Sequence, residues 1–123
     1  MQNDNEKFKN EFKDRLYKFV LRLIKFLAAI PRNQITVVVV GQALRSGTSI
    51  LANYIEARAS SSRKEFTLFF QHSLKSANET GVWLMLLRDT NNGEKLELSL
   101  LSQELNEIAK IFASSVIKLK NKK

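Results

Sequence analysis

The sequence contains no cysteine, one histidine and one proline. Without cysteine the chain forms no disulfide and offers no thiolate to a metal ion, and a single histidine excludes a metal site built from several histidines. We therefore expect neither a metal site nor a cofactor. The lack of cysteine is also compatible with a reducing, cytoplasmic setting.

The sequence also lacks a long uninterrupted apolar run. Residues 19–30 form an apolar stretch, but Arg22 and Lys25 interrupt it, and residues 1–12 carry charges of both signs. A membrane-spanning helix needs about 20 mainly apolar residues, and a secretory signal needs an apolar core. Both features argue against secretion and membrane insertion, and we expect a cytoplasmic protein.

Basic residues exceed acidic ones by 20 to 12, which gives a formal net charge of +8. Such an excess favours a polyanionic partner, and nucleic acid is the first candidate. The segment SGTS at residues 46–49 is not a phosphate loop, because it has one glycine and no following lysine. A chain of 123 residues with 44% hydrophobic content fits a single domain that spans residues 1–123.

Apolar residues recur every three or four positions, which predicts helices at about residues 8–30, 33–57, 63–89 and 94–120. Pro31 closes the first stripe, which runs from Phe8 to Ile30. Asn33 is a good cap for the second helix, and Ser62 has the capping-box spacing to an acidic residue in the third. The valines at 37–40 would also suit a buried strand, but the length and period favour a helix. Four helices with short connections predict an all-α antiparallel up-down-up-down four-helix bundle.

A line of polar residues follows one face of the second helix: Gln42, Ser46, Ser49, Asn53 and Glu56. If the second and third helices pair where residue numbers add to about 121, Arg45 lies opposite Ser76 and one turn from Glu79. Buried donors and acceptors must find partners, and Arg45 with Glu79 would form a structural ion pair if this face is buried. The alternative is that this face points to water. The structural polar network predicted in this way consists of Gln42, Arg45, Ser49, Asn53, Glu56, Ser76 and Glu79.

Two apolar runs cover nearly the full circumference of their helices. They lie in the second and third helices, which run in opposite directions, so both runs fall at the same end of the bundle. A small bundle cannot bury such runs by itself, which predicts self-association, although a merely apolar bundle end is the alternative. The predicted oligomer interface consists of Val37, Val38, Val39, Val40, Val82, Trp83, Met85 and Leu86.

Basic residues gather at the opposite end, where the first helix starts, the second meets the third and the fourth ends. Self-association would repeat this patch and multiply weak phosphate contacts. The alternative is that the lysine-rich ends only aid solubility. The predicted nucleic-acid-binding residues are Lys7, Lys9, Lys13, Arg58, Arg63, Lys64, Lys118, Lys120, Lys122 and Lys123.

Other functional residues are scarce. Tyr17 and Tyr54 are the aromatic residues most available for stacking on bases, but packing within the bundle is the favoured interpretation of both. His72 has no partner that would orient it for acid-base chemistry. We therefore expect no enzymatic activity.

Motifs between residues 42 and 79 carry a family resemblance. The pattern Q-x-x-R-x-x-x-S-I-x-x-N-x-I-E is filled by Gln42, Arg45, Ser49, Ile50, Asn53, Ile55 and Glu56. It is followed by E-F-x-x-F at Glu65, Phe66 and Phe69, and by S-x-x-E at Ser76 and Glu79. In these motifs the chain resembles the four-helix-bundle proteins encoded in intervening sequences of bacterial large-subunit ribosomal RNA genes. It is similar as well to the accessory variability determinant of diversity-generating retroelements, and it departs from the pattern at Ala57, where the family usually has glycine.

The resemblance implies a homopentameric assembly of bundles with a basic surface and no enzymatic activity. For the retroelement branch it also implies binding to nucleic acid and to a reverse transcriptase. The basic residues are not part of the motif, so they are predicted from charge alone. The leading hypothesis is a non-catalytic oligomeric accessory protein that binds RNA or DNA, and the alternative is a protein-interaction scaffold without nucleic-acid binding.

Overall fold

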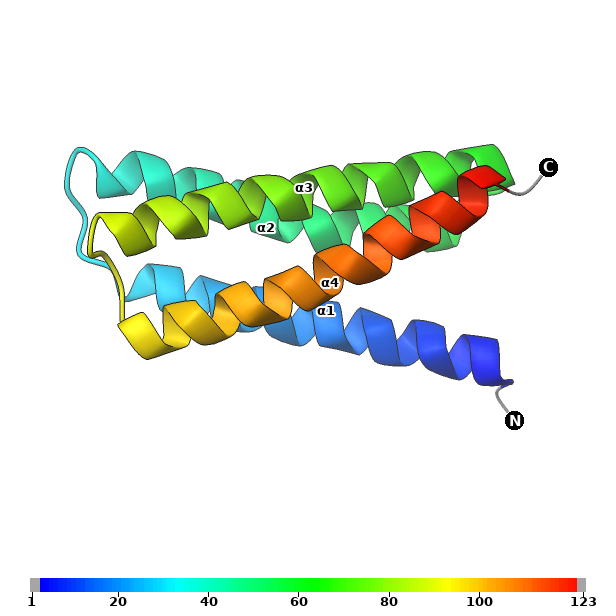
Figure 1. The fold of residues 1–123 in the computed structure, drawn as a ribbon, viewed down its shortest axis with the longest axis horizontal. Helices are drawn as coiled ribbons and strands as arrows, with labels where there is room; N and C mark the ends of the chain where they lie inside the picture. The colour runs from blue at the N-terminus through cyan, green and yellow to red at the C-terminus, as the bar shows by residue number, and fades with distance from the viewer. Residues whose placement is uncertain (1–2, 122–123) are drawn as a thin grey trace.

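A computed structural model describes residues 3–121, and all regular secondary structure in this range is helical. Neighbouring helices run in opposite directions, so the start of α1, the α2–α3 connection and the end of α4 share one end of the bundle, the terminal end (Figure 1). The other two connections lie at the far end. The predicted antiparallel four-helix bundle is confirmed, with helices α1 Asp4–Ala28, α2 Thr36–Ala59, α3 Arg63–Asp89 and α4 Lys95–Asn121.

Side chains at the two predicted cap positions accept hydrogen bonds from backbone N–H groups. Asn33 Oδ1 accepts hydrogen bonds from the backbone N–H groups of Ile35 and Thr36, both at 2.9 Å. Ser62 Oγ accepts from the N–H of Glu65 at 3.1 Å. These bonds satisfy donors that have no partner within the helix. The predicted cap at Ser62 is confirmed, whereas Asn33 caps the turn that precedes α2, because the helix itself begins at Thr36 with Ile35 as its N-cap residue.

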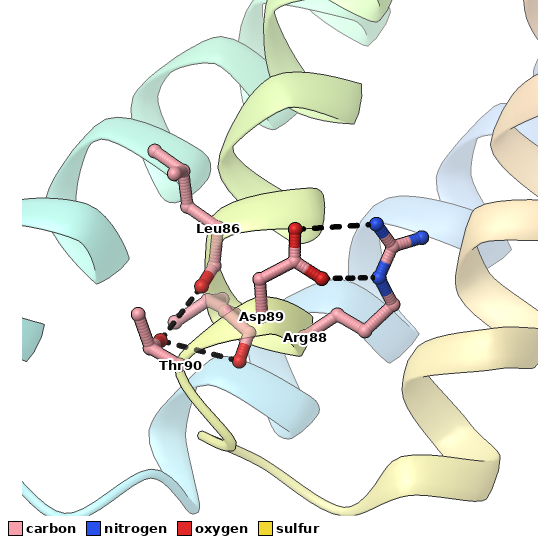
Figure 2. Close-up of polar contacts among 5 residues, drawn as sticks. Leu86, Arg88, Asp89 and Thr90 are labelled. Atoms are coloured by element: carbon pink, nitrogen blue, oxygen red, sulfur yellow. Dashed lines mark hydrogen bonds and ion pairs between the residues drawn. The ribbon is translucent and has the colours of Figure 1, made fainter.

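Polar residues that directly follow α3 terminate this helix. The Thr90 hydroxyl donates a hydrogen bond of 2.6 Å to the carbonyl of Leu86 (Figure 2). Asn91 adopts the left-handed conformation with φ of 58°, and the N–H of Asn92 donates to the carbonyl of Leu87 at 2.8 Å. This is the pattern of a Schellman motif, which ends the helix and satisfies its last carbonyls.

The core is filled by apolar side chains from all four helices. Toward the terminal end it becomes aromatic. Phe12 packs edge-on against Tyr54 and against Phe112, with ring centroids 5.2 and 5.3 Å apart, and Phe70 also packs on Phe112 at 5.3 Å. Such edge-to-face contacts stabilise the packing beyond the area they bury.

Small polar residues line the contact between α2 and α3. Thr80 Oγ1 lies 2.8 Å from Ser46 Oγ, and both residues are buried. Ser73, also buried, donates a hydrogen bond of 3.0 Å to the carbonyl of Ile50. Because each buried hydroxyl finds an acceptor, these helices pack closely without leaving a polar group unsatisfied.

Gly47 lets α1 approach α2. A Cβ atom added at Gly47 would overlap the Cδ2 methyl of Leu23, a fully buried residue of α1. By contrast, a Cβ atom at Gly41 would meet no other atom within 4 Å. Glycine at position 47 is therefore required by packing rather than by backbone conformation.

Two ion pairs join α1 to α4. Arg15 binds the Glu104 carboxylate through Nε and Nη2, at 2.7 and 2.8 Å. Arg22 binds Glu97 with the same bidentate geometry, through Nε at 3.1 Å and Nη2 at 2.6 Å. The bond to Glu104 raises the pKa of Arg15 above its ordinary value. In both pairs the residue numbers add to the same total, so the pairs lie one heptad apart in a constant register. We call these two pairs the α1–α4 clamps.

None of the helices within residues 3–121 combines the length and the apolar character that crossing a bilayer requires.

Candidate nucleic-acid interface

The terminal end brings the predicted cations together. The eight that lie within residues 3–121 are all exposed, and none forms an ion pair with another residue in that range. Lys122 and Lys123 lie outside the described residues. Exposed and unpaired, these cations are available to phosphates. The eight are Lys7, Lys9, Lys13, Arg58, Arg63, Lys64, Lys118 and Lys120.

The positive charge is not spread evenly over this end. Residues 4–14 of α1 carry four carboxylates beside their three lysines, so this segment has no net positive charge. Residues 108–121 of α4 carry three lysines and no carboxylate. The lysines of α1 therefore contribute less positive potential than their number predicted, because acidic residues lie between them. The positive potential is therefore centred on the end of α4 and the neighbouring α2–α3 connection.

Two arginines at the α2–α3 connection also contact the other helices. Arg58 Nη1 donates a hydrogen bond of 3.2 Å to Asn10 Oδ1 of α1. Arg63 Nη2 donates one of 3.2 Å to the carbonyl of Leu119, in the last turn of α4. Because an arginine has further donors, each can still bind a phosphate. These bonds attach the arginine of α2 to α1 and the arginine of α3 to α4 at the terminal end.

A pocket of about 260 Å³ opens between the start of α1 and the end of α4. Its charged lining residues are Lys9, Arg58 and Lys118, all of them exposed, whereas its deepest residues are buried. The cations therefore stand at the mouth and the rings at the floor and walls. No carboxylate lines the pocket within residues 3–121. The aromatic lining residues are Phe8, Phe12, Tyr54, Phe66 and Phe70.

The sequence did not predict this pocket, and the burial expected for Phe8 is wrong. Phe8 was expected to begin the buried stripe of the first helix, but it is 56% exposed. The ribbons of α1 and α4 diverge toward the terminal end, as Figure 1 shows, which leaves this ring uncovered. Tyr54 is 2% exposed, so its predicted packing role is confirmed, whereas the same expectation for Tyr17, at 56%, is wrong.

Tyr54 forms part of the pocket floor as a neutral phenol. Its hydroxyl donates a hydrogen bond of 3.1 Å to the carbonyl of Lys9. Burial raises the pKa of Tyr54, and the nearby charge of Arg58 lowers it by less. The hydroxyl therefore stays protonated at physiological pH and continues to donate.

The polar line on α2 does not meet α3 as expected. Ser49 Oγ donates to the carbonyl of Arg45, and Asn53 Nδ2 donates to the carbonyl of Ser49, each at 2.9 Å and within α2. Gln42 is half-buried and Glu56 exposed, and within residues 3–121 neither has a side-chain hydrogen bond to α3. Ser46, which belongs to the same polar line, does meet α3 through Thr80, and next to it Ser73 of α3 donates to the carbonyl of Ile50. The predicted network is therefore wrong for a single chain.

The register between α2 and α3 explains part of this difference. The bonded pairs Thr80–Ser46 and Ser73–Ile50 have numbers that add to 126 and 123, rather than the expected value of about 121. Small side chains at this contact let the helices approach closely, and this contact sets both the rotation of α2 and its alignment with α3. Consequently Ser76 lies near the level of Ser49 rather than opposite Arg45.

The hypothesis of a buried Arg45–Glu79 ion pair is also wrong for the single chain. Both residues are exposed, and within residues 3–121 neither takes part in an ion pair. Glu79 instead accepts a hydrogen bond of 3.3 Å from Trp83 Nε1. Water solvates both charges, so no burial cost forces them together.

The predicted oligomer interface is partly covered by the chain itself. Val39, Val40 and Trp83 are half-buried and pack against the core. The other five residues stay between 41% and 58% exposed, at the far end of α2 and α3. We call these five the far-end patch. It consists of Val37, Val38, Val82, Met85 and Leu86.

These features define a class of protein: an all-helical four-helix bundle with a basic terminal end and an apolar far-end patch. Residues 9–114 match the family described as 23S rRNA-intervening sequence protein. The chain belongs to this family. The predicted resemblance is confirmed at this level, and the comparisons give no support to the finer resemblance to the retroelement determinant.

A solved structure has the same fold. The chain is 34% identical to a protein of unknown function from the S23 ribosomal protein family of Bacteroides thetaiotaomicron, with a TM-score of 0.80. The match covers 88% of this chain and 96% of the other. No curated protein matches the chain closely.

Proposed function

We propose that this chain is a non-catalytic accessory protein that binds RNA or DNA through phosphate contacts at its terminal end. The observation that carries the proposal is the group of eight exposed cations, drawn together from all four helices, that have no ion-pair partner within residues 3–121. Phosphates are the polyanions that such a surface attracts without sequence preference. The cytoplasm is the setting we propose for it.

We further propose that the far-end patch is covered by other copies of the chain. Five large apolar side chains, each at least 41% exposed, lie together at the end opposite the cations. Copies that meet at this patch would present several basic ends, and linked weak sites bind much more tightly than one. The subunit number implied by the resemblance is five. A reverse transcriptase is the protein partner implied by the retroelement branch.

The test is to remove charge from the terminal end while leaving the fold intact. The variant combines Arg58→Gln, Arg63→Gln, Lys118→Gln and Lys120→Gln, all at exposed positions. Its matched control removes four exposed cations elsewhere, by Lys25→Gln, Arg32→Gln, Lys75→Gln and Lys95→Gln. Binding of labelled RNA and DNA is measured by fluorescence anisotropy over a salt series.

For the wild type we expect affinity to fall steeply as salt rises. Each lost phosphate contact lowers the slope of log affinity against log salt by about one. In the terminal-end variant this slope should therefore be smaller than in the wild type by about three to four. In the control it should stay close to the wild-type slope. An affinity that does not depend on the salt concentration would instead support the alternative of a protein-interaction scaffold. The absence of binding at low salt would refute the proposal.

A further inference from the structure

The pocket at the terminal end exists because α1 and α4 separate beyond the α1–α4 clamps. The clamps pair Arg22 with Glu97 and Arg15 with Glu104, at intervals of seven residues on each helix. One further interval brings Phe8 level with Ile111, and both of these residues line the pocket. The helices are thus held at a fixed register on one side of the pocket, and within residues 3–121 no ion pair joins them on the other side.

The walls of the pocket suit a flat aromatic ring. Phe8 and Phe12 lie nearly parallel, at an interplanar angle of 8° with centroids 6.1 Å apart. Phe66 and Phe70 are also stacked, at 4.5 Å and 27°. Phe8 is 56% exposed, so much of its ring is open to an incoming molecule. Aromatic side chains that offer exposed ring surface are the platforms on which unpaired nucleobases stack.

The mouth of the pocket suits the phosphates attached to such a ring. Lys9, Arg58 and Lys118 come from three different helices, and they surround an opening whose lining has no carboxylate within residues 3–121. A purely apolar ligand would gain nothing from these charges. A base that carries phosphates on both sides uses the rings and the cations together. In a duplex the bases are already paired and stacked, so a single strand reaches the pocket at much lower energetic cost.

We infer that this pocket receives one unpaired base of a single-stranded RNA or DNA, stacked on Phe8, while Lys9, Arg58 and Lys118 hold the neighbouring phosphates. The inference rests on the proposed function, because the same cations serve both. It adds that the protein prefers single strands to duplexes. Asn5 and Ser115 also line the pocket and offer hydrogen-bonding groups to the edge of the base.

The experiment compares Phe8→Ala with Tyr17→Ala. Both aromatic residues lie on α1 and are 56% exposed, but only Phe8 lines the pocket. Because both side chains are exposed, neither change should unfold the bundle, which circular dichroism checks. Each protein is titrated with a labelled single strand of ten nucleotides, with its duplex and with a strand of the same length made of abasic sites.

We expect Phe8→Ala to weaken single-strand binding by about 5- to 150-fold, the range measured when one stacking residue is lost. Binding to the duplex and to the abasic strand should change less than twofold, and Tyr17→Ala should change none of the three. Phe8→Trp, which keeps a stacking surface, should retain binding. The slope against salt should stay the same in Phe8→Ala, because no phosphate contact is lost.

The outcomes separate the two proposals. If the wild type binds single strand and duplex equally and Phe8→Ala changes neither, the inference is overturned while phosphate binding stands. If the loss in Phe8→Ala is as large on the abasic strand, the ring does not stack on a base, and the inference fails again. If the wild type binds no nucleic acid at low salt, the proposed function itself fails.

Discussion

Thr80 and Ser46 join α3 to α2 through two buried hydroxyl groups whose oxygens lie 2.8 Å apart. Thr80 Oγ1 also lies 2.8 Å from the carbonyl of Ser76, one turn earlier in the same helix. A hydroxyl donates one hydrogen bond and accepts others, so the two side chains satisfy one another and the backbone. No buried side-chain nitrogen or oxygen within residues 3–121 lacks a partner.

This arrangement predicts a non-additive pair of substitutions. Thr80→Val alone leaves Ser46 with its 3.3 Å bond to the carbonyl of Ala43, and Ser46→Ala alone leaves Thr80 with its bond to the carbonyl of Ser76, so each should lower the free energy of unfolding by about 0.5 to 1.5 kcal/mol, the net worth of one hydrogen bond. The double variant removes both polar groups and should lose less than the sum. Urea denaturation of the four proteins measures this coupling, and strictly additive losses would show that the hydroxyls do not interact.

Glycines in α2 predict opposite effects of one substitution. Gly47→Ala would push a methyl group into Leu23, and overpacking of a core typically lowers the free energy of unfolding by about 1 to 3 kcal/mol. Gly41→Ala meets no atom and should raise it by about 0.5 to 1 kcal/mol through helix propensity. Thermal and urea denaturation compare the two. Equal stabilisation by both would mean that α1 and α2 are less closely packed than described.

Because its phenol is buried, Tyr54 should lower the free energy of unfolding at alkaline pH. Burial raises the pKa of Tyr54 above its ordinary value of 10.0, so the folded state favours the neutral phenol. Stability from this preference is fully present below pH 10 and is lost as the pH rises through the folded pKa. The stability advantage of the wild type over Tyr54→Phe should therefore be constant below about pH 10 and shrink as the pH rises above it.

Urea titrations at several pH values test this prediction. Tyr17→Phe, at an exposed tyrosine on α1, is the matched control for the loss of a hydroxyl. A difference between wild type and Tyr54→Phe that stays constant as the pH rises above about 10 would contradict the effect assigned to burial.

The far-end patch predicts concentration-dependent association. Val38→Glu together with Met85→Glu places charges at positions that are 58% and 48% exposed, so the single chain should still fold. Any assembly that buries the patch should dissociate, because an unpaired charge in an apolar contact is costly. Leu100→Glu and Ile117→Glu, at exposed apolar positions of α4, form the matched control. Light scattering gives the mass of each protein, and a wild type that stays monomeric at high concentration would refute self-association.

Most of the fold could be predicted from the sequence. Three helices have apolar residues on one face and polar residues on the other, and this spacing identified them and most of their core. The exception is α2, where Leu44 and Ile55 are 40% exposed, whereas Ser46 is buried. Close packing on α3 requires small side chains there, and hydropathy does not distinguish a small buried residue from a solvated one.

The candidate site was harder to predict. Charge composition identified the basic end, because cations near helix ends cluster wherever the topology brings those ends together. The pocket depends on the divergence of α1 and α4, which residue spacing does not specify. Phe8 has the same spacing as the buried Phe12, and only the position of α4 leaves one ring open and covers the other.

The contact between Gly47 and Leu23 has a consequence for the evolution of this family. Positions 47 and 23 share one space, so a relative with a larger residue at the first should carry a shorter side chain at the second. Changes at the two positions should then be correlated among related sequences, and the strength of that correlation would report how closely the first two helices pack in each of them.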